Sequence, residues 1–189
     1  KFPAGGDYTL YHDFTPAGGV QQIAQVPVKV EGIPAAPVKL AVDDKTPKTI
    51  DGYTAALGTG GPVKTGAPAK LTFTLSNGTA PVTTLTPYLD AMGHLVVLSE
   101  DGREFVHSHP VGGHEGHAAT CGPTVAFEAH FKTPGLYKAW GQFNVGTKEK
   151  ERIITAPFVF EVARGGKPAD DRGEGKVKDG GAGHGHDHK

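Results

Sequence analysis

The 189-residue chain lacks several features that assign proteins to common classes. It has no run of 18 or more apolar residues, so we expect no transmembrane segment. Its formal net charge is −1 and it has no stripe of Lys and Arg, which argues against binding to nucleic acid. Cys121 is its single cysteine, so an intrachain disulfide is excluded. It neither begins with Met nor contains a signal peptide, so we expect residue 1 to be a processed or truncated end.

Glycine and proline, in contrast, are abundant, with 28 and 15 residues. They separate short runs that are rich in Val and Thr, a pattern that is typical of β-strands joined by turns. No stretch free of Gly and Pro is long and amphipathic enough to predict a helix. The composition therefore predicts an all-β protein.

Two segments of the chain form an internal repeat: residues 2–14 (FPAGGDYTLYHDF) and residues 131–143 (FKTPGLYKAWGQF). After one inserted residue the match continues through Ile23, Pro27 and Glu31. Each copy predicts a β-hairpin, because its side chains alternate as strand faces do. The gapless matches are Phe2 with Phe131, Gly6 with Gly135, Tyr8 with Tyr137, Tyr11 with Trp140 and Phe14 with Phe143.

The repeat and the composition together predict four regions. Residues 1–31 correspond to the terminal strands of an incomplete upstream β domain. Residues 32–48 are Pro-rich and predict an extended linker, and residues 1–48 could dock on other protein subunits. Residues 49–164 predict one complete domain. Residues 165–189 have no aromatic residue and one Val, which predicts a disordered tail containing histidines.

The predicted fold class is an immunoglobulin-like antiparallel β-sandwich, preceded by a partial second β domain. Short strands separated by turn signals such as Asn77-Gly78 favour it. The strands expected in the complete domain are 51–57, 69–76, 85–90, 94–100, 103–109, 124–131, 136–145 and 152–162.

A histidine-bearing hairpin is predicted over residues 91–110, AMGHLVVLSEDGREFVHSHP, with its turn at Asp101-Gly102. Pairing Glu100 with Arg103 places His94 opposite His109 and Val96 opposite His107. Side chains alternate between the two faces of a strand, so one face carries all three histidines. The other residues expected on this face are Val96, Leu98 and Phe105.

Three imidazoles on neighbouring strands converge, because cross-strand Cβ atoms lie about 4.5–5.5 Å apart. We therefore predict a metal site at His94, His107 and His109. The alternatives are a hydrogen-bonded polar cluster, or a different turn register, since a slip of one residue sends His94 to the other face. Imidazole suits copper, zinc, nickel and iron. Met92 favours copper if its thioether reaches the site, although it could equally fill a gap in the core.

The loop after the hairpin could add ligands from His114, His117 and Cys121. These three residues could instead form a separate zinc site, although their spacing matches no strong signature, or they could be ordinary loop residues. The C-terminal histidines resemble a metal-scavenging tract or an artificial addition. They are His184, His186 and His188.

The string PYLDAMGHLVVLSEDGREFVHSHP, followed by GPTVAFEAHFKTPGLYKAWGQF, resembles a known group of bacterial proteins. These are secreted or periplasmic heavy-metal-binding or copper-handling proteins with a Gly-His…His-x-His-Pro signature and immunoglobulin-like domains of the FixH/YtkA type. The resemblance covers residues 70–162, and residues 7–22 look like the end of another such domain. It implies a periplasmic or extracellular location and metal binding, with no established reaction. The signature residues are Gly93, His94, His107, His109 and Pro110.

Three functions compete at this point. The first is an extracytoplasmic copper-binding protein, with zinc as the alternative metal. The second is a structural or interaction subunit of a cell-surface or membrane-associated assembly, with residues 1–48 docked on other subunits and a structural metal. The third is a metalloenzyme, which is disfavoured because no paired carboxylates or Ser/His/Asp pattern accompany the histidines. A blue-copper carrier is also disfavoured, because Cys121 and His130 do not have the required spacing. We therefore expect no enzymatic activity.

Overall fold

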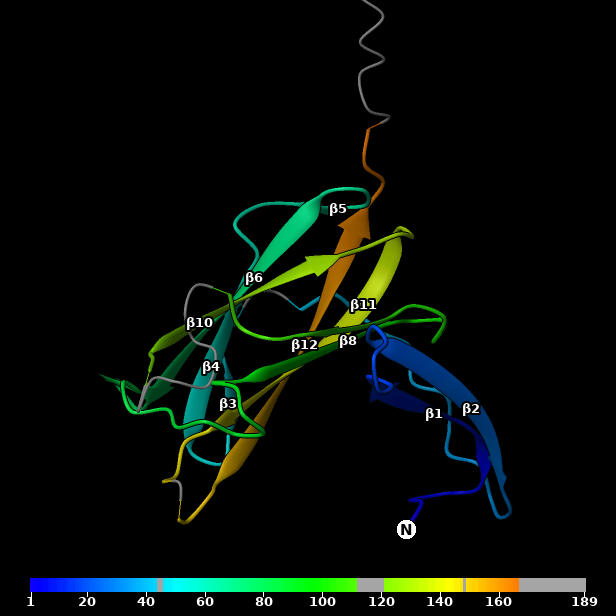
Figure 1. The fold of residues 1–189 in the computed structure, drawn as a ribbon, viewed down its shortest axis with the longest axis horizontal. Coiled ribbons are helices and arrows are strands. Elements are labelled where there is room, and N and C mark those ends of the chain that lie inside the picture. The colour runs from blue at the N-terminus through cyan, green and yellow to red at the C-terminus, as the bar shows by residue number, and fades with distance from the viewer. Residues whose placement is uncertain (44–45, 112–120, 148, 167–189) are drawn as a thin grey trace, which may run out of the picture.

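The computed structural model describes residues 1–43, 46–111, 121–147 and 149–166, and all of its regular elements are strands (Figure 1). No helix in these residues is long and apolar enough to cross a membrane. The strands are β1 (Gly6–Phe14), β2 (Gln22–Val30), β3 (Lys48–Ile50), β4 (Tyr53–Gly58), β5 (Val63–Lys64), β6 (Pro68–Asn77), β7 (Ala80–Pro81), β8 (His94–Ser99), β9 (Phe105–Ser108), β10 (Thr124–His130), β11 (Gly135–Asn144) and β12 (Ile153–Ala163).

Ten of these strands form two sheets that face each other. One sheet has the order β10-β6-β4-β3, with β7 also paired to β6, and the other has the order β5-β12-β11-β8-β9. Neighbouring strands are antiparallel except for the short β12–β5 pair. The predicted fold class is therefore confirmed: the chain is an all-β, sandwich-like protein.

The core lies between the two sheets and is built on the alternation of side chains along β6, β10, β11 and β12. Phe73 on β6 is fully buried at its centre. Its ring contacts Phe127, Phe143 and Phe158, with centroid distances of 5.9, 5.4 and 5.9 Å. Each such buried aromatic side chain stabilises the fold by about 1.5–3 kcal/mol relative to an exposed one.

The predicted register of the histidine hairpin is correct. Val96 pairs with His107 and Leu95 with Ser108, so β8 and β9 align as the sequence indicated. The backbone amide of Ser99 also donates to the carbonyl of Glu104, at 2.9 Å. These pairings place the even-numbered residues of β8 on the same face as the odd-numbered residues of β9.

The turn of this hairpin, however, differs from the prediction, because Asp101-Gly102 does not form a two-residue loop. The amide of Gly102 donates to the carbonyl of Ser99 at 2.9 Å, so the connection is longer. The Asp101 carboxylate accepts bonds from the Ser99 hydroxyl (2.6 Å) and the Arg103 amide (3.1 Å). These side-chain bonds favour the longer turn, and since one residue is added on each side, the register is preserved.

The strand expected at 85–90 is absent. Leu85 and Thr86 make only isolated bridges, to Cys121 and Asn144, among the described residues. The residues that follow cannot continue a ladder of strand hydrogen bonds, because Pro87 has no amide hydrogen. Leu89 and Asp90 adopt positive φ angles, of 47° and 62°. The short strands β3, β5 and β7 were in turn not expected.

The internal repeat has a structural counterpart. In the first copy the ring of Phe2 contacts Tyr8 at 4.7 Å, and the Tyr8 hydroxyl donates to the carbonyl of Ala4 at 2.9 Å. In the second copy the ring of Phe131 contacts Tyr137 at 4.9 Å, and its hydroxyl donates to the carbonyl four residues upstream at 2.8 Å. A tyrosine bonded to backbone just upstream at the start of a strand is a hallmark of immunoglobulin-like sandwiches.

The β1–β2 hairpin forms a two-stranded sheet of its own, set against one side of the sandwich (Figure 1). Tyr11 and Asp13 of β1 point toward β9. The opposite face, here called the outer face, is mainly apolar and exposed to varying degrees. In the second copy of the repeat, the β11 residues that correspond to this face are buried between the two sheets of the sandwich. The large apolar side chains of the outer face include Tyr8, Leu10, Phe14, Val26 and Val28, and it also carries the exposed His12.

The segment between β2 and β3 is attached to the sandwich at several points. The amide of Leu40 donates to the Glu100 carboxylate at 3.2 Å. The amide of Asp43 donates to the carbonyl of Val159 at 3.0 Å, and the Asp43 carboxylate accepts from the Val159 amide at 2.6 Å. The residues expected to form an extended linker therefore run along the domain.

Candidate metal site

The structure brings together the three histidines of the β8–β9 hairpin. One ring nitrogen from each of His94, His107 and His109 can be chosen so that all three lie within 4.8 Å of one another. The ring centroids are 4.9–5.7 Å apart. This three-histidine cluster could hold a metal ion.

The cluster lies on the face of the sheet that points away from the sandwich core. Leu95 and Val97, which alternate with His94 along β8, are fully buried in the core. His94 is itself only 6% exposed, whereas His107 is half-buried and His109 is exposed. The site is therefore deep on one side and open on the other.

A backbone carbonyl fixes the orientation of His94. Its Nε2 atom donates to the carbonyl oxygen of Tyr88 at 2.8 Å, so the proton of the neutral ring resides on Nε2. Burial lowers the pKa of His94 below its ordinary value, and the nearby His109 and His107 lower it further, against the effect of the Tyr88 carbonyl. The ring is therefore neutral at pH 7, and its Nδ1 lone pair is available.

A carboxylate fixes the orientation of His107. Its Nδ1 atom donates to Oδ2 of Asp13, which leaves Nε2 without a proton in the neutral ring. That Nε2 faces Nδ1 of His94 at 3.4 Å. Two lone pairs thus point at each other, and a proton or a metal ion between them relieves the repulsion. A metal ion can also engage a ring nitrogen of His109.

The spacing of these nitrogens fits a metal ion. Bonds of about 2.0–2.1 Å from a tetrahedral metal to two imidazole nitrogens place those nitrogens about 3.3–3.4 Å apart. The His94–His107 distance of 3.4 Å agrees with this value. The hydrogen bonds from the outer ring nitrogens to Tyr88 and Asp13 are also the kind that metal-bound histidines make. The donor set of three imidazoles suits copper, zinc, nickel or iron.

Asp13 was not anticipated from the sequence. The side-chain amide of Gln21 donates to both of its carboxylate oxygens, at 2.9 and 2.7 Å. Burial raises the pKa of Asp13, but hydrogen bonds from His107 and Gln21 and the nearby histidines outweigh burial, and the net pKa is lowered. The one available signal was the repeat, in which Asp13 aligns with the neutral Gln142.

The other residues considered as ligands lie elsewhere. Met92 precedes β8 and is fully buried in the hydrophobic core. Cys121 also belongs to the core, where burial raises its thiol pKa, and it is not part of the three-histidine cluster. His114 and His117 lie outside the described residues, as do the tail histidines at 184, 186 and 188.

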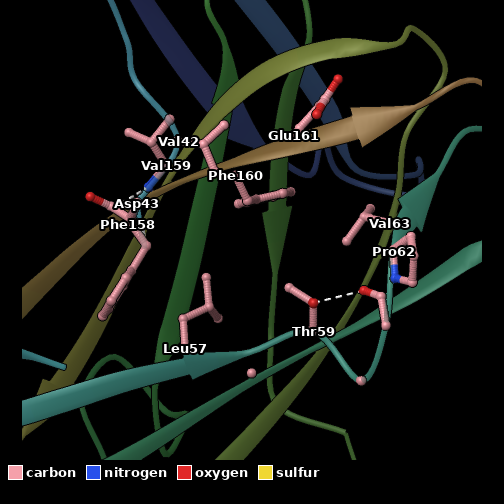
Figure 2. Close-up of a pocket in the computed structure, with 13 residues that line it drawn as sticks. Val42, Asp43, Leu57, Thr59, Pro62, Val63, Phe158, Val159, Phe160 and Glu161 are labelled. Carbon is pink, nitrogen blue, oxygen red and sulfur yellow. Dashed lines mark hydrogen bonds between the residues drawn. The ribbon is translucent and has the colours of Figure 1, made fainter. Parts of the chain in front are cut away.

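A hollow of about 450 Å³ opens elsewhere, between β12 and the segment that follows β4 (Figure 2). Its lining is mainly apolar, with Leu57, Phe158 and Phe160 projecting toward it. The carboxylate of Asp43 on its rim is bonded to the Lys48 ammonium at 2.7 Å. None of the residues that line it belongs to the three-histidine cluster.

Comparison with known proteins places the sandwich in a family. Residues 48–164 match the family model described as "Domain of unknown function (DUF8832)". The chain belongs to this family. No curated protein and no solved structure matches it. The DUF8832 region contains all three histidines of the cluster, whereas Asp13 and Tyr11 lie outside it.

Proposed function

We propose that this DUF8832 protein binds a copper ion at His94, His107 and His109 and handles that metal outside the cytoplasm. The observation that carries the proposal is the pair of ring nitrogens that face each other at 3.4 Å with their protons committed elsewhere. Burying such a pair costs free energy unless a cation is shared between them. A third histidine within coordination range supports a metal ion rather than a proton in that position.

Copper is preferred to zinc on chemical grounds. Among divalent first-row metals, Cu²⁺ binds most tightly to a given set of nitrogen ligands. The resemblance to copper-handling proteins with the Gly-His…His-x-His-Pro signature points in the same direction and supports a periplasmic or extracellular location. Zinc, which imidazole also suits, is the alternative metal.

We further propose a binding role rather than catalysis. Within the described part of the chain, the carboxylate that contacts the cluster is that of Asp13. It is occupied by His107 and by Gln21, so it is poorly placed to act as a general base. The exposed position of His109 supports exchange of the metal with solvent or with another ligand. These features fit the storage or delivery of a metal ion.

Metal titration of the purified chain tests the proposal. We expect one Cu(I) or Cu(II) ion per chain at high affinity, in competition with a chelator, and weaker binding of Zn(II). The triple variant His94→Ala/His107→Ala/His109→Ala should lose this ion. A matched control, His12→Ala/His130→Ala, removes exposed histidines outside the cluster and should retain it. Removal of His184, His186 and His188 separates binding by the tail. If the triple variant binds all three metals as tightly as the wild type, the proposal is wrong.

A second candidate is a structural or interaction subunit with a structural metal, and the outer face of the β1–β2 hairpin favours it. Leu10 and Val26 on that face are 47% and 48% exposed, although they pair with each other as core residues do. A face of this kind is typical of an interaction surface. Analytical ultracentrifugation tests this candidate: it predicts self-association that Leu10→Lys/Val26→Lys abolishes, and a monomer at high concentration argues for the metal-handling function alone.

A further inference from the structure

The contacts between the β1–β2 hairpin and the sandwich converge on the strand that carries His107. The Tyr11 ring stacks on Phe105 of β9, with centroids 4.8 Å apart and planes 10° apart. Two residues further along each strand, Asp13 bonds to His107. Because residues two apart share a strand face, these two contacts match one face of β1 to the histidine-bearing face of β9.

Tyr11 strengthens this attachment in two further ways. Its hydroxyl donates to the carbonyl of Gly102, in the turn between β8 and β9. Its ring also closes one side of a mainly apolar hollow that is lined by Val96, Leu98 and Trp140. The hairpin therefore covers the apolar part of the face that carries the cluster, and Asp13 reaches the cluster itself.

We propose that Asp13 is a positioning residue of the metal site, and that docking of the β1–β2 hairpin and binding of the metal are coupled. This inference rests on the proposed function. The Asp13 carboxylate, which Gln21 orients, holds Nδ1–H of His107 and so directs Nε2 of that ring toward the metal position. Carboxylates in this role also raise the basicity of the ligand, and their loss typically lowers metal affinity 10–100-fold.

The coupling follows from thermodynamic linkage. If the docked hairpin raises metal affinity by some factor, the metal raises the docking equilibrium by the same factor. Asp13 and Tyr11 lie outside residues 48–164. The metal affinity of the DUF8832 domain in this chain therefore depends on the β1–β2 hairpin, which the family region does not include. Metal loading then tightens a contact between two parts of the chain.

The first test measures metal affinity in the full-length chain. Asp13→Ala should lower the metal affinity about 10–100-fold. Asp13→Asn should lower it less, because an amide oxygen still accepts from Nδ1–H of His107. Asp13→Glu should restore part of the loss. The matched control is Asp7→Asn, which removes the same charge from an exposed position on the same strand face. Tyr11→Ala, which undocks the hairpin without removing a ligand, should also lower the affinity.

The second test follows docking directly. Stacking on Phe105 shifts the ring proton resonances of Tyr11, so their positions in NMR spectra report the docked population. Addition of Cu(I) or Zn(II), which are diamagnetic, should move them further toward the docked values in the wild type and in Asp7→Asn. The same addition should not move them in Asp13→Ala or His107→Ala.

The two proposals fail in different ways. A wild-type chain that binds no metal overturns the proposed function, and this inference with it. If the wild-type chain binds metal, and if Asp13→Ala and Tyr11→Ala bind it as tightly as Asp7→Asn does, the coupling alone is overturned. Near-ultraviolet circular dichroism of each variant checks that the sandwich remains folded.

Discussion

At the scale of single residues, the protons of the histidine cluster define what the site can do. His94 and His107 each donate from their outer nitrogen to a fixed oxygen, on Tyr88 and Asp13. Each is thereby held in the tautomer whose inner nitrogen is unprotonated. The ring of His107 is held by Asp13 of β1, which lies more than ninety residues earlier in the chain. The chemistry of the cluster thus depends on its neighbours as much as on the ligands.

The lowered pKa of His94 predicts that the metal-free protein loses stability in mild acid. Below about pH 6.5 the unfolded chain takes up a proton at this residue while the folded chain does not, so the free energy of unfolding falls as pH falls. Above that pH the effect vanishes. Urea unfolding at pH 7.5, 6.5 and 5.5 should show a smaller pH dependence in His94→Gln than in the wild type. The exposed His12→Gln should behave as the wild type, and an equal slope in all three proteins contradicts the prediction.

Tyr137 gives a second residue-scale prediction. Its single hydroxyl proton is shared between the carboxylate of Glu104 (2.6 Å) and the carbonyl of Thr133 (2.8 Å), and burial together with the Glu104 contact raises its pKa to about 12. Tyr137→Phe should lower the free energy of unfolding by about 1–3 kcal/mol, since a bond to a charged acceptor is lost from a buried site. The repeat provides the control: Tyr8→Phe removes the corresponding hydroxyl from the hairpin and should leave the main urea transition unchanged. Equal losses in the two variants would argue against the role of Glu104.

At the scale of elements, the two hairpins of the repeat show how the surroundings decide which residue a position tolerates. Gly141 on β11 faces the core, where an added Cβ would lie 2.7 Å from the ring of Phe73. The equivalent residue of β1 is His12, which is exposed on the outer side of its hairpin. In the second copy the opposite sheet of the sandwich covers Gly141. Within the described residues no sheet covers His12 in the same way, so the first copy accommodates a large side chain at this position.

Gly141→Ala should therefore be costly and His12→Ala should not. Overpacking a well-filled core typically costs about 1–3 kcal/mol, so the alanine at position 141 should lower the midpoint of urea unfolding accordingly. The exposed substitution should change the free energy of unfolding by less than about 0.5 kcal/mol. A Gly141→Ala variant as stable as the wild type would mean that Phe73 moves aside without cost.

The elements also show what the sequence could and could not predict. The strand faces and the β8–β9 register follow from the period of two and from turn residues near position 101, so the convergence of the histidines was predictable. The turn itself was not, because bonds from the Ser99 and Asp101 side chains extend it. Residues 85–90 resemble a strand in composition but carry Pro87 and two positive φ angles. The contact of Asp13 with His107 joins distant segments, and no local pattern encodes it.

At the scale of the whole molecule, the cluster lies where two parts of the chain meet. The sandwich supplies three imidazoles on the sheet face that points away from its core, and the β1–β2 hairpin supplies Asp13 across the junction. Junctions with few contacts open more readily than packed cores, so this region is expected to respond most to ligands. A bound metal then stabilises the junction without changing the core.

Metal should therefore stabilise the folded chain by mass action, and His109 isolates this effect. A ligand at 100 times its Kd adds about 2.7 kcal/mol to the free energy of unfolding. Because His109 is exposed and outside the core, His109→Ala should have nearly the wild-type Tm without metal, yet should lose most of the increase in Tm on adding copper. Differential scanning calorimetry with and without the metal measures both quantities. An unchanged increase in His109→Ala would mean that His94 and His107 bind the ion without the third ring, whereas a large fall in Tm without metal would assign His109 a structural role.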